Sequence, residues 1–126
     1  MRINSDKIYN HIAAKHTERT QNIISFVPQG KNYKSLPANL RESRKFHVAW
    51  TRLHYDKPSP TIDTGHRHHF HPEANRIPTV RESARIQSFP DRFIFYGSKT
   101  SQYEQVGNAV PPILSRTIAM EIKKRL

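Results

Sequence analysis

The spacing of apolar and polar residues predicts two helices in the last third of the chain. Thr79 and Glu82 have the spacing of a capping box, which predicts a helix over about 80–88 that ends before Pro90. A second helix is expected to begin near Val110, because proline is tolerated in a first helical turn. Its apolar residues form one stripe, with Arg116, Lys123 and Lys124 facing away: Ile113, Leu114, Ile118, Ile122 and Leu126. That stripe needs a surface to pack against.

Patterns in the first half are shorter. Residues 5–17 have helical periodicity, and residues 22–30 predict a short apolar strand ended by proline and glycine. Residues 29–45 are polar and basic, which favours a loop with at most one helical turn. Residues 46–55 alternate as in a half-buried strand. A second short strand is predicted over residues 61–64, within a segment rich in His and Pro.

The composition predicts a thin core. The 126 residues allow one domain, or one domain and a tail, and only 35% of them are hydrophobic. We therefore expect the core to be small or to be completed by another body. No apolar run approaches the roughly 20 residues that span a bilayer, and no basic-then-apolar leader opens the sequence. A cytoplasmic protein without a membrane segment is the expectation.

The charge favours a polyanionic partner. The formal net charge is +11, with 11 Lys and Arg against 4 Asp and Glu in residues 1–60 and 10 against 6 in residues 61–126. Neutralising phosphates releases counterions, so such an excess is typical of nucleic-acid binding; a solvated basic surface is the alternative. The sequence has no cysteine, which excludes disulfides, thiolate metal sites and thiol catalysis within these residues.

Two long motifs are the most specific feature of the sequence. "RIPTVRESARIQSFPDRFIFYG" and "QYEQVGNAVPPILSRTIAMEI" resemble conserved blocks nine and ten of the DNA cytosine-5 methyltransferases. "RLHYDKPSPTIDT" resembles the end of the target-recognition domain in that family, and residues 11–37 more loosely resemble its start. The resemblance extends over about the whole chain and is close from Arg52 onward.

The resemblance implies an α+β fold in two parts. Residues 1–75 would form an irregular β-rich target-recognition region that binds double-stranded DNA. Residues 76–126 would hold two helices that complete a Rossmann-like methyltransferase domain and pack on the catalytic part.

The catalytic half of this family is not among these residues. Its members carry a Gly-rich cofactor loop, a Pro-Cys pair and a catalytic Glu ahead of the blocks seen here, and none of these is present. The reaction needs a soft nucleophile on C6 of cytosine, and the base must first leave the duplex. The resemblance therefore implies a part of an S-adenosylmethionine-dependent enzyme that is inactive until a catalytic half or large subunit is added.

The resemblance also implies contacts to S-adenosylmethionine. Block ten lines the cofactor pocket of the family, which assigns Asn108, Ala109 and Val110 as cofactor contacts, formed only with the catalytic half. Gly107 is expected to let the backbone approach closely. The alternative is that Asn108 only caps the helix that follows, and both roles can coexist.

Loop residues supply the candidate DNA contacts. His and Arg in residues 61–71 offer donors to base edges, and phosphate contacts are predicted elsewhere. The full set is Thr61, Thr64, His66, Arg67, His68, His69, Arg81, Arg85, Lys99 and Ser101. Structural ion pairing is the alternative for Arg81 and Arg85, and a plain exposed loop is the alternative for Lys99 and Ser101.

The basic loop provides further phosphate candidates, which are Lys31, Lys34, Arg41, Arg44 and Lys45. The His cluster raises the alternative of a zinc site formed by His66, His68, His69 and His71. That spacing matches no common zinc site, and no metal is predicted.

Three hypotheses for function follow. The first is a subunit or fragment of a methyltransferase. The second is an autonomous basic DNA-binding module, and the third is a degenerate remnant that only folds or associates with itself through the apolar face of its last helix.

Overall fold

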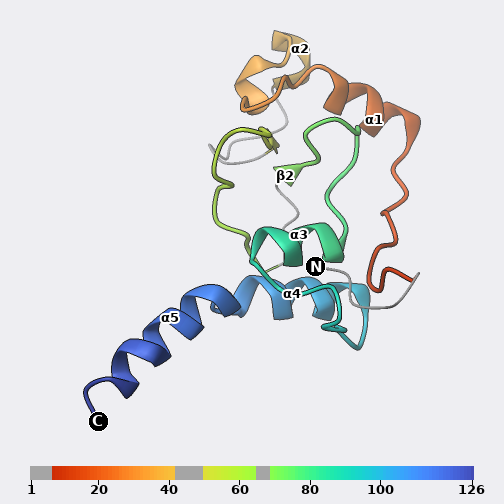
Figure 1. Ribbon diagram of the computed structural model, residues 1–126. Coiled ribbons are helices and arrows are strands. Elements are labelled where there is room, and N and C mark those ends of the chain that lie inside the picture. Colours follow the sequence, from red (N-terminus) through yellow and green to blue (C-terminus); the bar gives the residue numbers. More distant parts are fainter. Residues whose placement is uncertain (1–6, 42–49, 65–68) are drawn as a thin grey trace. The chain divides into compact units, whose positions relative to one another are not determined.

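The computed structural model describes residues 7–41, 50–64 and 69–126 (Figure 1). They form a mixed fold of helices and one small sheet, in agreement with the expected α+β class. The elements are α1 (Glu18–Ser25), the 3-10 helix η1 (Tyr33–Ser35), α2 (Ala38–Arg41), β1 (Thr51–Arg52), β2 (His69–Phe70), α3 (Val80–Ile86), α4 (Lys99–Asn108) and α5 (Pro112–Lys123). The chain divides into two compact units. Unit 1 comprises residues 1–11, 62–65 and 80–126, and unit 2 comprises residues 12–61 and 66–79.

Unit 2 has a core of a few apolar side chains around a two-stranded parallel pair. β1 and β2 pair in the register Thr51↔His69 and Arg52↔Phe70. Helix α1 begins after Thr17, whose hydroxyl accepts a hydrogen bond from the Thr20 amide at 3.2 Å. The buried apolar residues of the unit are Ile24, Val27, Leu36, Leu53, Phe70 and Ile77.

The first half differs from the predictions at three places. Residues 7–17 are not helical and residues 22–25 end α1 instead of forming a strand, so both predictions are wrong. The N-cap at Thr17 explains the shift, because it starts the helix where the predicted one ends. Residues 61–64 form no strand either. The described residues of the predicted loop over 29–45 hold two short helical elements, η1 and α2, where at most one helical turn was predicted.

Residues 46–49 of the strand predicted over 46–55 lie outside the described residues. Within its described part, β1 supplies only Thr51 and Arg52. Arg52 and Leu53 are both buried.

Unit 1 is built on the packing of α3 against α4. Helix α3 begins at Val80 as predicted, but ends at Ile86, two residues early. Ser88 has a left-handed φ of 62°, and the Phe89 amide donates to the Ala84 carbonyl at 2.8 Å, which closes the helix before the proline is reached. The core of the unit consists of Val80, Ala84, Phe95, Tyr103 and Val106.

Helix α5 was predicted nearly at its observed position, and α4 was not predicted. The N-cap of α5 is Pro111, with Pro112 as its first helical residue. Helix α4 occupies residues for which the sequence indicated a polar loop and a turn. It begins after Ser98, whose hydroxyl accepts from the Ser101 amide at 3.2 Å. Within the described part of the chain, none of the helices is long and apolar enough to span a membrane.

Candidate functional site

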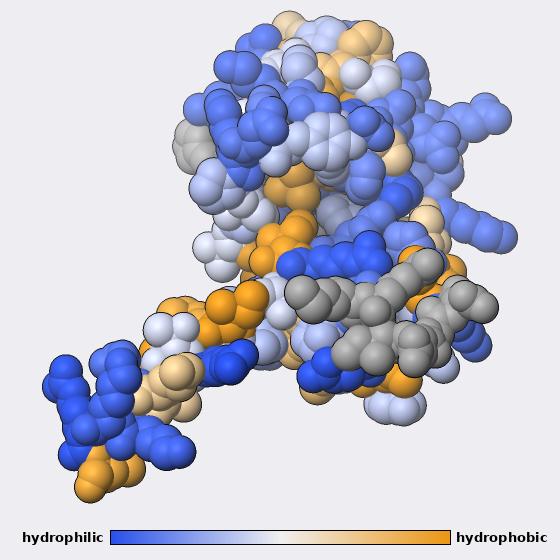
Figure 2. Space-filling view, in the orientation of Figure 1, coloured by the Kyte–Doolittle hydropathy of each residue, from blue (hydrophilic) through white to orange (hydrophobic). Residues whose placement is uncertain are grey.

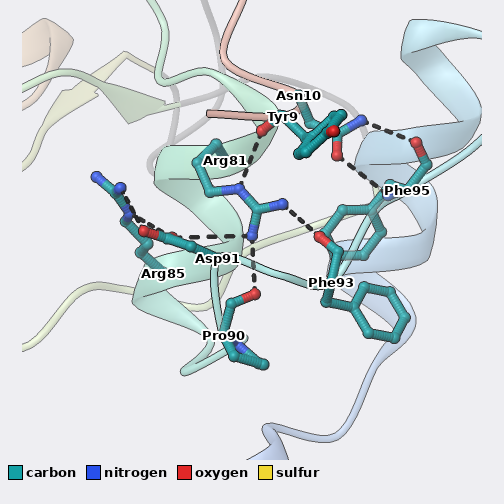
Figure 3. Close-up of polar contacts among 8 residues, drawn as sticks. All are labelled: Tyr9, Asn10, Arg81, Arg85, Pro90, Asp91, Phe93 and Phe95. Atoms are coloured by element: carbon teal, nitrogen blue, oxygen red, sulfur yellow. Dashed lines mark hydrogen bonds and ion pairs between the residues drawn. The ribbon is translucent and has the colours of Figure 1, made fainter. Parts of the chain in front are cut away.

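A buried arginine in the first turn of α3, Arg81, bonds several segments of unit 1 (Figure 3). The side chain of Arg81 has no exposed surface. Its Nε donates to the carbonyl of Tyr9 at 3.1 Å and its Nη1 to that of Pro90 at 3.1 Å, while its Nη2 donates to that of Phe93. Burial lowers the pKa of Arg81, and the charge of Asp91, 4.0 Å from Nη1, opposes that effect. The guanidinium has no exposed surface for a phosphate. This geometry therefore favours a structural role for Arg81 over a contact to DNA.

Arg85, one turn further along α3, forms a two-bond fork with Asp91. Its Nε and Nη2 donate to the two carboxylate oxygens at 2.8 and 2.7 Å. This hydrogen bonding lowers the pKa of Asp91 and raises that of Arg85. The Arg85 side chain is still 45% exposed, so it pairs structurally and also faces solvent.

We expect the Asp91 ion pairs to stabilise unit 1 at neutral and mildly acidic pH and to lose this effect in strong acid. The folded pKa of Asp91 is lowered, so the contribution is complete above the unfolded value of about 3.9 and is lost as pH falls through the folded value. For an exposed pair it amounts to about 1 kcal/mol or less. The free energies of unfolding of wild type and Asp91→Asn should differ at pH 7 and converge in acid. A difference that stays constant down to acid pH would contradict this assignment.

Asn10 has a structural role that the sequence did not indicate. Its side-chain amide bonds both backbone groups of Phe95, with Nδ2 to the carbonyl at 2.8 Å and the Phe95 amide to Oδ1 at 3.1 Å. The Asn10 carbonyl also accepts from the Arg81 amide at 3.0 Å. Its φ of 59° is left-handed, a conformation that Asn tolerates better than most residues. The sequence signal that could have indicated this role is an Asn directly after an aromatic residue in a short turn.

The junction between α4 and α5 carries the predicted cofactor contacts. Asn108 is the last residue of α4 and is exposed, and the Val110 side chain is 58% exposed. Ala109 is half-buried. Because α5 has Pro111 at its N-cap and no side-chain cap bond, Asn108 does not cap that helix. The three residues therefore present an amide and an apolar side chain at the surface.

Gly107, in the last turn of α4, lies against the backbone of residues 63–64. A Cβ built on it would lie 2.5 Å from the carbonyl oxygen of Asp63 and 2.9 Å from the Cα of Thr64. The close approach at Gly107 is thus to the chain's own backbone, and an approach to the cofactor stays a prediction. Residues 63–64 lie near the start of the predicted recognition loop of residues 61–71.

Helix α5 exposes a series of apolar side chains. None of the residues of α5 is buried. Figure 2 shows hydrophobic and hydrophilic residues side by side along the surface of this helix. Ile113, Leu114, Ile118 and Ile122 are 68, 50, 48 and 55% exposed. The stripe predicted from the sequence is thus on the surface in full.

Some predicted DNA contacts are brought together and others are not described. In unit 2, the ring Nε2 of His69 lies 3.1 Å from the Thr61 carbonyl. Thr64, in unit 1, is exposed. The predictions for His66, Arg67 and His68 fall on residues outside the described ones. Among the described residues no cluster of His, Asp or Glu could hold a metal ion. The ring Nδ1 of His71 accepts a hydrogen bond from the Ala74 amide at 3.0 Å.

Lys99 and Ser101 lie in the first turn of α4, so the prediction of a loop there is wrong. Both are half-buried, and the Ser101 hydroxyl accepts from the Gln105 side chain at 3.2 Å. Of the basic loop, Lys31, Lys34 and Arg41 are exposed, while Arg44 and Lys45 lie outside the described residues.

Arg52 is a second buried arginine that the sequence analysis missed. Its Nη2 donates to the Ile24 carbonyl at 2.6 Å and to Oδ1 of Asn75 at 2.8 Å. Its Nη1 donates to the carbonyl of His71 at 3.0 Å. Burial lowers the pKa of Arg52. Arg52 thus ties the end of α1 to the turn after β2, and no local pattern marks such a residue.

Comparison with known proteins identifies the class as DNA-modifying methyltransferases. The chain is 44% identical over 117 residues to the type II methyltransferase M1.HphI of Haemophilus parahaemolyticus, covering 93% of this chain and 32% of the relative. It is 48% identical over 117 residues to the putative type II methyltransferase M.MJ0563P of Methanocaldococcus jannaschii, covering 93% of this chain and 36% of the relative. The chain thus spans about a third of the length of these relatives.

A shorter relative has nearly the extent of this chain. The type II methyltransferase M.AquIB of a Picosynechococcus strain is 33% identical over 138 residues, covering 100% of this chain and 95% of the relative. The family model of C-5 cytosine-specific DNA methylases matches residues 1–124. The chain belongs to this family, and the prediction made from the two C-terminal motifs is confirmed.

Proposed function

We propose that this chain supplies the DNA-recognition and cofactor-pocket-completing portion of a DNA (cytosine-5-)-methyltransferase. The thiol nucleophile and most of the cofactor site would lie on a catalytic body outside these 126 residues, since they contain no cysteine. The observation that carries the proposal is α5, a helix of a methylase family member that buries none of its residues.

Helix α5 has the exposed area that a docking helix needs. Burying a Leu or Ile side chain completely stabilises by about 1.5–3 kcal/mol. Four apolar residues of α5 are about half exposed, namely Ile113, Leu114, Ile118 and Ile122. Burying their exposed parts on docking would contribute on the order of 5 kcal/mol. We propose that α3 and α5 complete the helical layer of a Rossmann-like catalytic domain. Residues 76–126 would be the part that docks.

The α4–α5 junction fits one side of a cofactor site. The exposed amide of Asn108 can bond a polar group of S-adenosylmethionine, and Ala109 and Val110 can contact an apolar one. When bound, that cofactor supplies the methyl group. These residues would hold and orient it, and the catalytic body would form the remaining walls.

Residues 1–75 would bind double-stranded DNA. The net charge of +11 supports this, together with exposed Thr61, Thr64 and the basic residues of the loop before β1. Arg85, Lys99 and Ser101 remain candidates for phosphate contacts in unit 1, and Arg81 does not, because it is buried.

The relative M.AquIB, itself called a type II methyltransferase, is matched by this chain over 95% of its length. The proposal holds equally for a catalytic body on a separate polypeptide and for one on the same chain.

Complementation tests the function. The part of M1.HphI that lies outside the match would be expressed alone and mixed with this chain, duplex DNA and radiolabelled S-adenosylmethionine. We expect methyl transfer only in the mixture, and none from either piece. The reference is the same M1.HphI piece mixed with its own matching segment. Methylation by this chain alone, or a silent mixture beside an active reference, would refute the proposal.

Variants of α5 sharpen this test. Ile118→Asp with Ile122→Asp should leave the stability of the free chain within about 0.5 kcal/mol, because neither residue is buried. The same pair should abolish complementation by placing charges in the docking face. The matched control is Arg116→Ser with Lys123→Ser, on the side of the helix predicted to face away. If both pairs complement equally well, α5 is not the docking element.

A further inference from the structure

Unit 2 contains a cleft that the proposed function does not use. Its volume is about 450 Å³, within the range of small-ligand sites. Ile23 of α1, Phe70 of β2 and Ile77 form apolar parts of its lining, and Trp50 lies beside them. Lys15 and Arg19 complete the lining with two cationic side chains. An aromatic and apolar interior with cations at its edge is the composition of a site that binds nucleotides.

Trp50 is held in an unusual conformation at this cleft. Its φ of 56° is left-handed, which is an outlier for a residue of that size and costs about 1–3 kcal/mol. Its ring lies 6.0 Å from the Phe70 ring at an angle of 50°. Strain of this kind is found where the surrounding structure holds a side chain for a purpose. Here it places the indole at the wall of the cleft.

The two cations are suited to phosphate. Lys15 and Arg19 are both exposed, and within the described part of the chain neither pairs with a carboxylate. They lie four residues apart, at the start of α1 and just before it. Consecutive phosphates of a DNA strand could therefore be neutralised next to an aromatic wall.

We propose that this cleft receives an unstacked base of a DNA strand, with the base on Trp50 and the flanking phosphates on Lys15 and Arg19. The proposal rests on the proposed function for the choice of DNA as the partner. It adds a second contact, made by Trp50, Lys15 and Arg19, which lie outside residues 61–71. When the target base leaves the duplex, the neighbouring part of the strand is disturbed. A site of this kind would hold that part of the strand.

The test uses the fact that Trp50 is the single tryptophan of the chain. The full chain would be titrated with a single-stranded oligodeoxynucleotide, an intact duplex and an abasic strand of equal length, while Trp50 fluorescence is recorded. The single strand should quench emission to saturation. The abasic strand, which has phosphates and no bases, should bind without quenching, and the duplex should quench less than the single strand.

Variants separate the base contact from the phosphate contacts, with binding measured by anisotropy of a labelled single strand. Trp50→Leu should weaken binding by about 5-fold to 150-fold, while Trp50→Phe, which keeps an aromatic face, should bind nearly as wild type. Lys15→Ala with Arg19→Ala should lower the salt slope by about 1.4, for two lost phosphate contacts. The control pair Lys57→Ala with Arg92→Ala removes equal charge from exposed positions outside the cleft. Circular dichroism would verify that each variant is folded.

Three outcomes would overturn the proposal. They are no quenching by any strand, quenching by the abasic strand equal to that by the single strand, and an equal decrease of the salt slope in the two charge-pair variants. A chain that binds no nucleic acid at all would overturn it as well. Because complementation of methyl transfer is measured independently, the proposed function could still hold in each of these cases.

Discussion

Replacing Arg81 with leucine is expected to destabilise unit 1 by about 3–5 kcal/mol, a large part of the roughly 5–15 kcal/mol that holds a domain together. The substitution removes the buried guanidinium and leaves three partly buried carbonyl groups, of Tyr9, Pro90 and Phe93, without their donor. Lysine should rescue little, because one ammonium cannot reach three carbonyls as the planar fork does. Urea unfolding followed by circular dichroism measures the change.

Arg85→Leu is the matched control for Arg81. It lies on the same helix and contacts the same carboxylate, but its side chain is 45% exposed. Its loss should therefore cost about 1 kcal/mol or less. Equal effects of the two substitutions would show that the buried carbonyl contacts of Arg81 contribute nothing special to the fold.

The Gly107→Ala variant should also be destabilised, against the ordinary helix preference. Alanine gains roughly 0.5–1 kcal/mol over glycine within a helix. Here its Cβ would lie 2.5 Å from the Asp63 carbonyl oxygen and 2.6 Å from the carbonyl carbon, and backbone atoms cannot move aside as a side chain can. Overpacking of this kind costs about 1–3 kcal/mol or more, so the clash outweighs the gain. Thermal unfolding should show a lower midpoint.

Asn108→Ala, at the next position, provides the comparison. Asn108 is exposed, and alanine is the better helix former, so stability should stay within about 0.5 kcal/mol of wild type or rise. In the complementation assay, Gly107→Ala should also reduce methyl transfer by moving residues 63–64. A Gly107→Ala chain as stable as wild type would contradict the observed close approach.

The sequence predicted the C-terminal helices better than the rest because their signals are local. The Thr79–Glu82 spacing and the apolar stripe of α5 depend on neighbours a few residues away, and both helices were found. Helix α4 was missed because its sequence has few apolar residues, of which Tyr103 and Val106 are buried.

The candidate site was predicted through resemblance more than through pattern. The block that contains "GNAV" indicated the family, but it did not show that Gly107 packs on residues 63–64. Arg81 was marked as a candidate DNA contact, and its burial depends on Tyr9, which is 72 residues away in sequence. Arg52 likewise bonds residues 19 to 28 positions away, and no spacing rule connects them.

Under the proposed function, the surface position of α5 has a consequence for how tightly this chain and the catalytic body would hold each other. Helices of about 12 residues are marginal on their own in water, and α5 has 12 residues, none of which is buried. Part of the docking energy would therefore be consumed in ordering the helix. Its amide protons should exchange with solvent fastest among the helices of unit 1 and become protected when the catalytic body is added. Assembly would then be reversible and would depend on the concentration of both halves.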